Sequence, residues 1–231
     1  RLAKPLSLLD LEKIKTGLKE ASAVDIEVLN VIDSTNQYLK DKLTNIKQGH
    51  TCLAEAQTAG RGRRGRKWVS PYAASLYLSM HWSFDEGYSA LSGMSLAVGV
   101  AIVEALNLCG VPGVQLKWPN DIYLEGVKLA GILIDLEGQA LEPSHSVIGI
   151  GLNLTIPEQA ASKIDQDWTD LQNHCNEKID RNLLVARIIF HLLKRLEQHK
   201  LEGLSSMINE WHDQDYYLNK KVILLTGDKV I

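Results

Sequence analysis

A short glycine- and arginine-rich run limits what this chain can fold into more than any other segment. Residues 60–67 read GRGRRGRK, so that five cationic side chains and two glycines occupy the seven positions after Gly60. Cationic side chains this close repel one another, and glycine loses conformational entropy when it is ordered. The run therefore predicts a loop that gains stable structure only when an anion binds to it.

The same run contains the dinucleotide-binding pattern G-x-G-x-x-G, formed by Gly60, Gly62 and Gly65. That pattern is meaningful only where a strand leads into a helix whose N-terminus meets a pyrophosphate. Here Pro71 would break a helix begun at the loop, and the variable positions are arginines. The sequence argues against a dinucleotide-binding fold and leaves the arginines as anion-binding groups.

Composition places this positive loop in a mildly acidic protein. The 231 residues are 45% hydrophobic and 23% charged, enough to bury a core, and the net charge is −3. A general nucleic-acid-binding protein is usually basic overall, so a small anionic ligand is favoured. The three cysteines fit no zinc or disulfide spacing, and no histidine has a second ligand at metal spacing. We therefore expect a cytoplasmic protein without a side-chain metal site or a membrane-spanning segment.

Hydrophobic periodicity predicts an α/β domain of the α+β type, a mixed sheet with flanking helices. Strands are expected at 26–32, 50–57, 75–82, 114–118, 122–124, 127–136 and 146–154. Helices are expected at 8–19, 37–43, 89–108, 182–197 and 205–211, and a polar, irregular loop at 156–170. A further strand at 222–225 starts a new pattern. We place a mixed α/β domain at 1–218 and the beginning of a small β module at 219–231.

Lys117 precedes a Trp-Pro-Asn-Asp turn, at the predicted end of a strand where ligands often meet a sheet. A lysine is a compact point charge suited to a phosphate. The same residues are also typical of a solvated lysine before an ordinary turn, because Pro-Asn-Asp is a common turn composition. Taken alone, this segment favours the second interpretation.

Two further segments carry polar residues or glycines beside predicted strands. Residues 33–36, DSTN, could cap a helix or hydrogen-bond a urea or amide group. Gly149 and Gly151 could let a flat ring lie against a strand, with Asn153 at the ring edge, or could mark a bulge.

Together these segments closely resemble the bacterial biotin–protein ligases, including the biotin–[acetyl-CoA-carboxylase] ligases and the bifunctional ligase–repressors. The resemblance is carried, in order, by DSTNQ at 33–37, QTAGRGRRGRKW at 57–68, KWPND at 117–121, KLAGIL at 128–133 and GIGLN at 149–153. It covers most of the chain. The basic loop combined with KWPND is its most specific part.

The resemblance implies an ATP-dependent, AMP-forming reaction in two steps. The biotin carboxylate attacks the α-phosphorus of MgATP, which gives biotinyl-5′-AMP and pyrophosphate. A lysine amine of a biotin carboxyl carrier protein then attacks the mixed anhydride, which gives an amide and AMP. The resemblance also implies a class II synthetase-like catalytic domain, an SH3-like barrel beginning at 219–231 and a homodimer. Repressor members add an N-terminal helix-turn-helix for operator DNA, which we expect residues 1–231 to lack.

The resemblance also assigns roles to residues. The catalytic residues are Lys117 and Arg63, which would stabilise charge developing on the α-phosphate. The biotin-binding set is Ser34, Thr35, Asn36, Gln57, Gly60, Arg61, Gly62, Arg63, Lys117 and Gly149. The set that binds ATP or the adenylate is Arg61, Arg63, Arg66, Trp68, Lys117, Asn120 and Asn153. We expect the basic loop to be mobile without ligand and to fold over the adenylate, and Arg63→Ala to release that intermediate.

Two alternatives stay open. A lipoate–protein ligase or transferase is a structural relative of the family, although the arginine-rich loop with KWPND favours biotin. A nucleic-acid-binding regulator would use the same arginines on phosphates, but the acidic pI of about 6.2 argues against this chain acting so alone.

Overall fold

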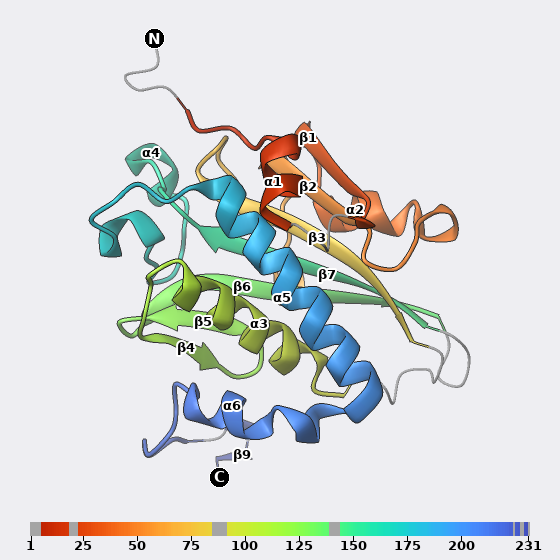
Figure 1. Ribbon diagram of the computed structural model, residues 1–231. Helices are drawn as coiled ribbons and strands as arrows, with labels where there is room; N and C mark the ends of the chain where they lie inside the picture. The colour runs from red at the N-terminus through yellow and green to blue at the C-terminus, as the bar shows by residue number, and fades with distance from the viewer. Residues whose placement is uncertain are drawn as a thin grey trace.

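The computed structural model describes residues 6–18, 23–84, 92–138, 144–223, 225–226 and 229–230. Its centre is a seven-stranded sheet with the order β1-β2-β3-β7-β6-β5-β4 (Figure 1). The strands are β1 (Ile26–Ile32), β2 (Thr51–Gln57), β3 (Ser75–Phe84), β4 (Val114–Lys117), β5 (Asp121–Leu124), β6 (Val127–Glu137) and β7 (Ser144–Asn153). β1 and β2 pair in parallel, and every other neighbouring pair is antiparallel. The mixed sheet confirms the predicted fold class.

One face of the sheet carries the main hydrophobic core beneath α1 (Leu11–Leu18), α3 (Met94–Leu108) and α5 (Arg181–Glu202). Figure 1 shows α3 and α5 crossing this face. α3 is buried along most of its length, which accounts for its nearly continuous apolar sequence. α5 is amphipathic, and the Asp180 side chain caps its first turn by accepting backbone N–H bonds.

The opposite face carries α2 (Thr35–Lys40), which packs through Leu39 against Cys52 of β2. Strand side chains alternate between the two faces of a sheet. Cys52, Ser79 and Gly149 lie in register across β2, β3 and β7, so all three face α2. Polar residues and a glycine on this row leave room beside α2 for a pocket.

The remaining elements follow the sheet toward the C-terminus. They are α4 (Glu158–Ala161), α6 (Ile208–Asp213) and the two-residue strands β8 (Leu225–Thr226) and β9 (Lys229–Val230). β8 and β9 pair as an antiparallel hairpin. The strand expected at 222–225 is wrong at its start, because Val222 and Ile223 are exposed and lie outside any strand.

Several other elements differ from the sequence pattern; the second helix, for example, spans Thr35–Lys40 and not 37–43. The first helix begins at Leu11, because the Asp10 carboxylate accepts the backbone N–H groups of Glu12 and Lys13. The stretch 156–170 is not wholly irregular, since it contains α4 and a small buried cluster around Ile156. α3 begins at Met94, and the expected start at residue 89 lies outside the described residues.

Within the described ranges, no helix is both long and apolar enough to cross a lipid bilayer.

Candidate active site

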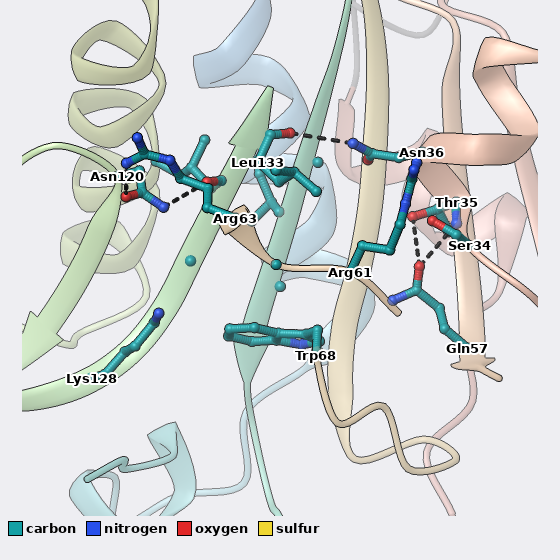
Figure 2. Close-up of a pocket in the computed structure, with 16 residues that line it drawn as sticks. Ser34, Thr35, Asn36, Gln57, Arg61, Arg63, Trp68, Asn120, Lys128 and Leu133 are labelled. Atoms are coloured by element: carbon teal, nitrogen blue, oxygen red, sulfur yellow. Dashed lines mark hydrogen bonds between the residues drawn. The ribbon is translucent and has the colours of Figure 1, made fainter. Parts of the chain in front are cut away.

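A pocket opens on the α2 face of the sheet, over β6 and β7 (Figure 2). It encloses about 500 Å³ of space free of protein atoms, part of it open to solvent. Its lining residues are Ser34, Thr35, Asn36, Gln57, Arg61, Gly62, Arg63, Trp68, Asn120, Lys128, Gly131, Ile132, Leu133, Gly149, Ile150 and Gly151. All of the predicted biotin-binding residues are among them except Gly60 and Lys117.

The floor of this pocket consists of strand glycines on which side chains lie directly. The Trp68 indole lies over Gly131 and Gly151, and the Asn36 amide lies over Gly149. A Cβ atom at Gly151 would overlap with the indole, and one at Gly149 with the Asn36 amide, whereas one at Gly131 would lie 3.1 Å from Cζ3 of Trp68. The flat ring expected against these glycines is therefore the protein's own Trp68.

Four polar side chains form a connected chain along one wall. The Gln57 Oε1 atom accepts the Thr35 backbone N–H at 2.9 Å and lies 3.1 Å from the Thr35 hydroxyl. The Ser79 hydroxyl lies 2.7 Å from the Thr35 hydroxyl and 2.5 Å from Oδ1 of Asn36. Thr35, Asn36 and Ser79 are buried. Ser34 fits the capping role, since its side chain accepts the Gln37 N–H at the start of α2.

The basic loop folds back on itself beside the floor. The backbone N–H of Trp68 donates to the Gly60 carbonyl at 2.9 Å, and the backbone N–H of Gly62 donates to the Arg66 carbonyl at 2.7 Å. A Cβ atom at Gly60 would come within 2.6 Å of both Ser70 Oγ and the Trp68 carbonyl oxygen. Gly60 is therefore required by the closure of the loop and does not itself line the pocket.

Two arginines project from the loop into the pocket (Figure 2). Arg61 donates to the Asp135 carboxylate at 3.1 Å, and Arg63 donates to Oδ1 of Asn120 at 2.6 Å. Both arginine side chains are thus held over the pocket by neighbours on the sheet side. Whether the loop is mobile without ligand stays a prediction.

A second pocket lies on the other side of Trp68. It encloses about 800 Å³ of space free of protein atoms and is lined by Arg66, Lys67, Trp68, Val69, Lys128, Asn153, Lys163, Ile164, Asp165, Gln166 and Trp168. Of the residues expected at ATP, Arg66, Trp68 and Asn153 line this pocket, whereas Arg61, Arg63 and Asn120 line the first. Asn153 is buried, and its amide donates to the Thr169 carbonyl at 3.0 Å, which holds it in the wall.

Trp68 and Lys128 line both pockets and so mark the junction between them. The Lys128 amine lies 2.8 Å from Oδ1 of Asp121 and 5.6 Å from the centroid of the Trp68 ring. The junction therefore brings an ammonium group and an indole to the place where contents of the two pockets would meet.

Lys117 lies on the same sheet face but is absent from the described linings of both pockets. Its partner in register is Asp121, which pairs in turn with Gly131. The Lys117 amine donates to the Tyr123 hydroxyl at 2.8 Å and lies 4.4 Å from the centroid of that ring. Burial acts to lower the pKa of Lys117, but the hydrogen bond to Tyr123 and the nearby phenol of Tyr217 outweigh it, so the pKa is raised. The ammonium is held as a cation at the sheet edge.

A β-bulge explains why strand alternation misses Lys128. Tyr123 pairs with Lys128 and Ile122 pairs with Ala130, so Leu129 is an extra residue in β6. The extra residue reverses the alternation, and Lys128 faces the pocket together with Gly131. Strict alternation would have placed Lys128 on the core face.

Two residues behind the pocket lining also escape sequence reasoning. Ser79 lies in β3, which is buried along nearly its whole length and reads as a plain core strand. Asp135 lies near the end of β6 and reads as an ordinary surface carboxylate. Only the register of the described strands would have located them. Ser79 pairs with Gly149. Leu133 also pairs with Gly149, and Asp135 lies two residues beyond it on the same face.

Comparison with known proteins gives a consistent match. Residues 28–153 match the model of the "Biotin/lipoate A/B protein ligase family". The chain is 43% identical over 230 residues to the "Bifunctional ligase/repressor BirA" of Salmonella typhimurium, covering 100% of this chain and 71% of the relative. It is 33% identical over 206 residues to the "Biotin--[acetyl-CoA-carboxylase] ligase" of Mycobacterium tuberculosis, covering 82% of this chain and 74% of the relative.

The fold is similar to a solved structure of a biotin protein ligase from Aquifex aeolicus in complex with biotin and ATP. The TM-score is 0.74 at 28% identity, and the match covers 90% of this chain and 84% of that chain. The matched family model spans both the basic loop and the glycine-bearing β7. The chain belongs to the biotin/lipoate A/B protein ligase family.

Proposed function

We propose that this chain is a biotin–protein ligase, an enzyme that activates biotin with ATP and transfers it to a lysine of a carrier protein. The relative from Mycobacterium tuberculosis, which matches 82% of this chain, is named as a biotin ligase, the Salmonella relative is named as a ligase, and a similar structure holds biotin and ATP. The observation that carries the proposal is the pair of pockets that share Trp68 and Lys128. An adenylating enzyme needs two substrates to meet at one point.

The first pocket suits biotin. Its wall of Thr35, Asn36, Ser79 and Gln57 offers neutral donors and acceptors for a ureido group, which is polar but uncharged. The Trp68 ring and Leu133 add apolar surface for the rest of the molecule. Arg61 and Arg63 over the same pocket supply positive charge for the carboxylate.

The second pocket suits a nucleotide. Trp68 and Trp168 line it together with Arg66, Lys67 and Lys163. Aromatic rings can stack on an adenine, and the cations can contact phosphates. We propose that Mg²⁺ enters with the ATP phosphates. Asp121, paired with Lys128 at the junction, offers the kind of oxygen donor that this ion prefers.

The first chemical barrier is the repulsion between a carboxylate and a phosphate. Lys128 at the junction, with Arg63, can neutralise both groups and the charge that develops on the phosphate during attack. Preorganised donors of this kind each contribute about 3 kcal/mol to the stabilisation of a transition state. We therefore assign to Lys128 the role expected of Lys117, whose amine is engaged by Tyr123.

The proposal extends to partners at a coarser level. The acceptor is a biotin carrier protein whose lysine amine attacks the adenylate, as the chemistry of the family requires. A homodimer, operator DNA binding and a cytoplasmic location stay predictions from the resemblance. The lipoate alternative is not favoured, because the relative from Mycobacterium tuberculosis and the similar structure are named for biotin.

The test is exchange of labelled pyrophosphate into ATP, with biotin or lipoate as the carboxylic acid. Biotin-dependent exchange is expected, followed by transfer of biotin to a purified carrier domain. Exchange with lipoate alone would reassign the enzyme to the other branch of its family. If neither acid supports exchange, although circular dichroism shows that the chain is folded, the proposal is wrong.

A further inference from the structure

Asp135 is a carboxylate close to a pocket that, under the proposed function, binds an anion. It lies on β6 beside the floor of the first pocket, and its Oδ2 atom accepts from Nη2 of Arg61 at 3.1 Å. The same Oδ2 atom accepts from Nδ2 of Asn36 at 3.2 Å. A negative charge here works against anion binding, so its presence calls for another role.

That role follows from counting donors and acceptors. A carboxylate can only accept, so it fixes the Asn36 amide with its NH₂ group toward Asp135 and its oxygen toward Ser79. The Leu133 carbonyl, 3.3 Å from the same NH₂ group, supports this orientation. The amide of a buried asparagine would otherwise have two nearly isosteric orientations.

The fixed amide sets the direction of the next contacts. Ser79 has one hydroxyl proton and two oxygen neighbours, Oδ1 of Asn36 and the Thr35 hydroxyl. An amide oxygen cannot donate, so the Ser79 hydroxyl donates to Oδ1 of Asn36. The Thr35 hydroxyl then donates its one proton to Ser79 across 2.7 Å and not to Oε1 of Gln57, which still accepts the Thr35 backbone N–H. Each polar group along the wall then presents one defined face to a ligand.

We propose that Asp135 is a positioning residue, which fixes the donor and acceptor directions of the Asn36–Ser79–Thr35 chain in the biotin pocket and holds Arg61 at its mouth. This inference rests on the proposed function. Asp135→Leu keeps a similar volume but removes the Oδ2 acceptor that Asn36 and Arg61 share. Both donors then lose this acceptor, and only the Leu133 carbonyl still holds the orientation of the Asn36 amide.

A simpler interpretation is that Asp135 only competes with an anionic ligand for Arg61. The two roles predict opposite signs. Removing a competitor would tighten biotin, and a half-exposed ion pair of this kind is worth at most a few-fold in affinity. Leaving a buried polar group unsatisfied weakens binding by roughly tenfold or more. The larger effect decides the expected sign, so biotin should bind more weakly.

The experiment compares biotin with biotinamide, its uncharged amide, by calorimetric titration. Asp135→Leu is expected to weaken biotinamide by about tenfold and biotin by at least that factor, because the polar wall acts on parts that both ligands share and Arg61 also loses its partner. Tighter biotin with unchanged biotinamide would show a mere competitor and overturn the inference. Unchanged affinity for both ligands would overturn it as well.

Three further variants sharpen the test. Glu137→Leu makes the same change at the next residue of β6 on the same face, where the carboxylate pairs with Lys40 and not with the polar wall, and should leave both affinities unchanged. In an Asn36→Ala background, Asp135→Leu should weaken biotinamide little further, because it acts through Asn36. Asp135→Glu, which keeps an acceptor-only group, should bind both ligands within about threefold of the unchanged chain.

These outcomes separate the inference from the function. A loss in Asp135→Glu as large as in Asp135→Leu would show that shape, and not the hydrogen-bond acceptor, matters at this position, and would overturn the inference. If the unchanged, folded chain binds neither ligand, the proposed function itself is wrong. If the unchanged chain binds both ligands, but the Asp135 variants bind biotin more tightly or show no change in either affinity, only the inference is wrong.

Discussion

Two lysines on one sheet face make the clearest residue-level prediction. Lys128 lines both pockets, whereas the Lys117 amine is held by Tyr123. Lys128→Gln should lower kcat/KM for biotin-dependent pyrophosphate exchange by about 100-fold or more, because a preorganised charge at the junction is lost. Lys117→Gln should lower it by less than about tenfold, since only a surface contact is removed.

Steady-state exchange kinetics at varied biotin and ATP measure both variants. The reverse ranking, with Lys117→Gln the more damaging, would mean that the Lys117 amine leaves Tyr123 and enters the site when substrates bind. That result would assign the stabilisation of charge on the phosphate to Lys117, as the sequence predicts, and not to Lys128.

His81 gives a prediction about pH. It is buried, its Nδ1–H donates to the Lys47 carbonyl at 3.0 Å, and its Nε2 lies 3.1 Å from Nδ1 of His145. Burial lowers the pKa of His81 below its ordinary value of 6.5, and the neighbouring His145 and His50 lower it further. The unfolded chain therefore takes up this proton first as the pH falls through about 6.5. Stability should decrease from about pH 7.5 to about pH 5.5.

Urea denaturation at several pH values checks this expectation, with His81→Asn as the test variant and the exposed His212→Gln as its control. The slope with pH should flatten in the first variant only. Glu27 and Glu104, where hydrogen bonds from neighbouring side chains outweigh burial and lower the pKa, lose their contribution only below their ordinary value of 4.5. An unaltered slope in His81→Asn would exclude His81 as the cause.

At the scale of elements, β6 and β7 act as a floor on which Trp68 rests. Gly151→Ala would place a methyl group inside the indole ring, whereas the methyl of Gly131→Ala would be 3.1 Å from it. Overpacking costs about 1–3 kcal/mol. Gly151→Ala should therefore weaken both biotin and ATP by about tenfold, because Trp68 is shared by the two pockets, and Gly131→Ala should weaken both much less.

Calorimetric titration with each ligand, together with tryptophan fluorescence, measures these effects. If Gly151→Ala weakened the binding of only one of the two ligands, Trp68 would not be a wall common to both pockets. If Gly151→Ala and Gly131→Ala weakened binding equally, the closer approach of Gly151 to the Trp68 ring would not determine the effect.

The elements also show what could be predicted from the sequence. Periodicity placed the seven sheet strands, because buried strands and their turns have local signals, and the motifs named most of the first pocket. Lys128 was missed because the bulge at Leu129 reverses alternation, which no local pattern reveals. Ser79 and Asp135 were missed because their roles depend on register with β7 and on the approach of α2 and the loop. The sequence predicts that a ligand ring lies against Gly151, whereas in the structure the Trp68 indole lies there.

At the scale of the whole molecule, a buried ion pair ties together segments far apart in the sequence. Arg181, in the first turn of α5, donates to the Glu55 carboxylate of β2 at 2.9 Å and to the Ser75 carbonyl of β3 at 3.1 Å. It also donates to the Ser7 carbonyl, and Glu55 accepts the Leu9 N–H. The segment before α1 is thereby fixed to the strand that leads, two residues later, to Gln57 in the pocket wall.

Removing one partner of this pair should be costly, because Glu55 would remain as an uncompensated buried charge. Arg181→Met is expected to lower the free energy of unfolding by about 3–5 kcal/mol, measured by urea denaturation. Arg187→Met, a half-buried arginine of the same helix that donates to the Leu108 carbonyl, should cost about 1 kcal/mol. Adding Glu55→Gln to Arg181→Met should recover part of the loss, since the stranded charge is removed while an oxygen remains for the Leu9 N–H. Additive losses in the double variant would mean that the two side chains stabilise the fold independently, and that the N-terminal segment is held by its other contacts.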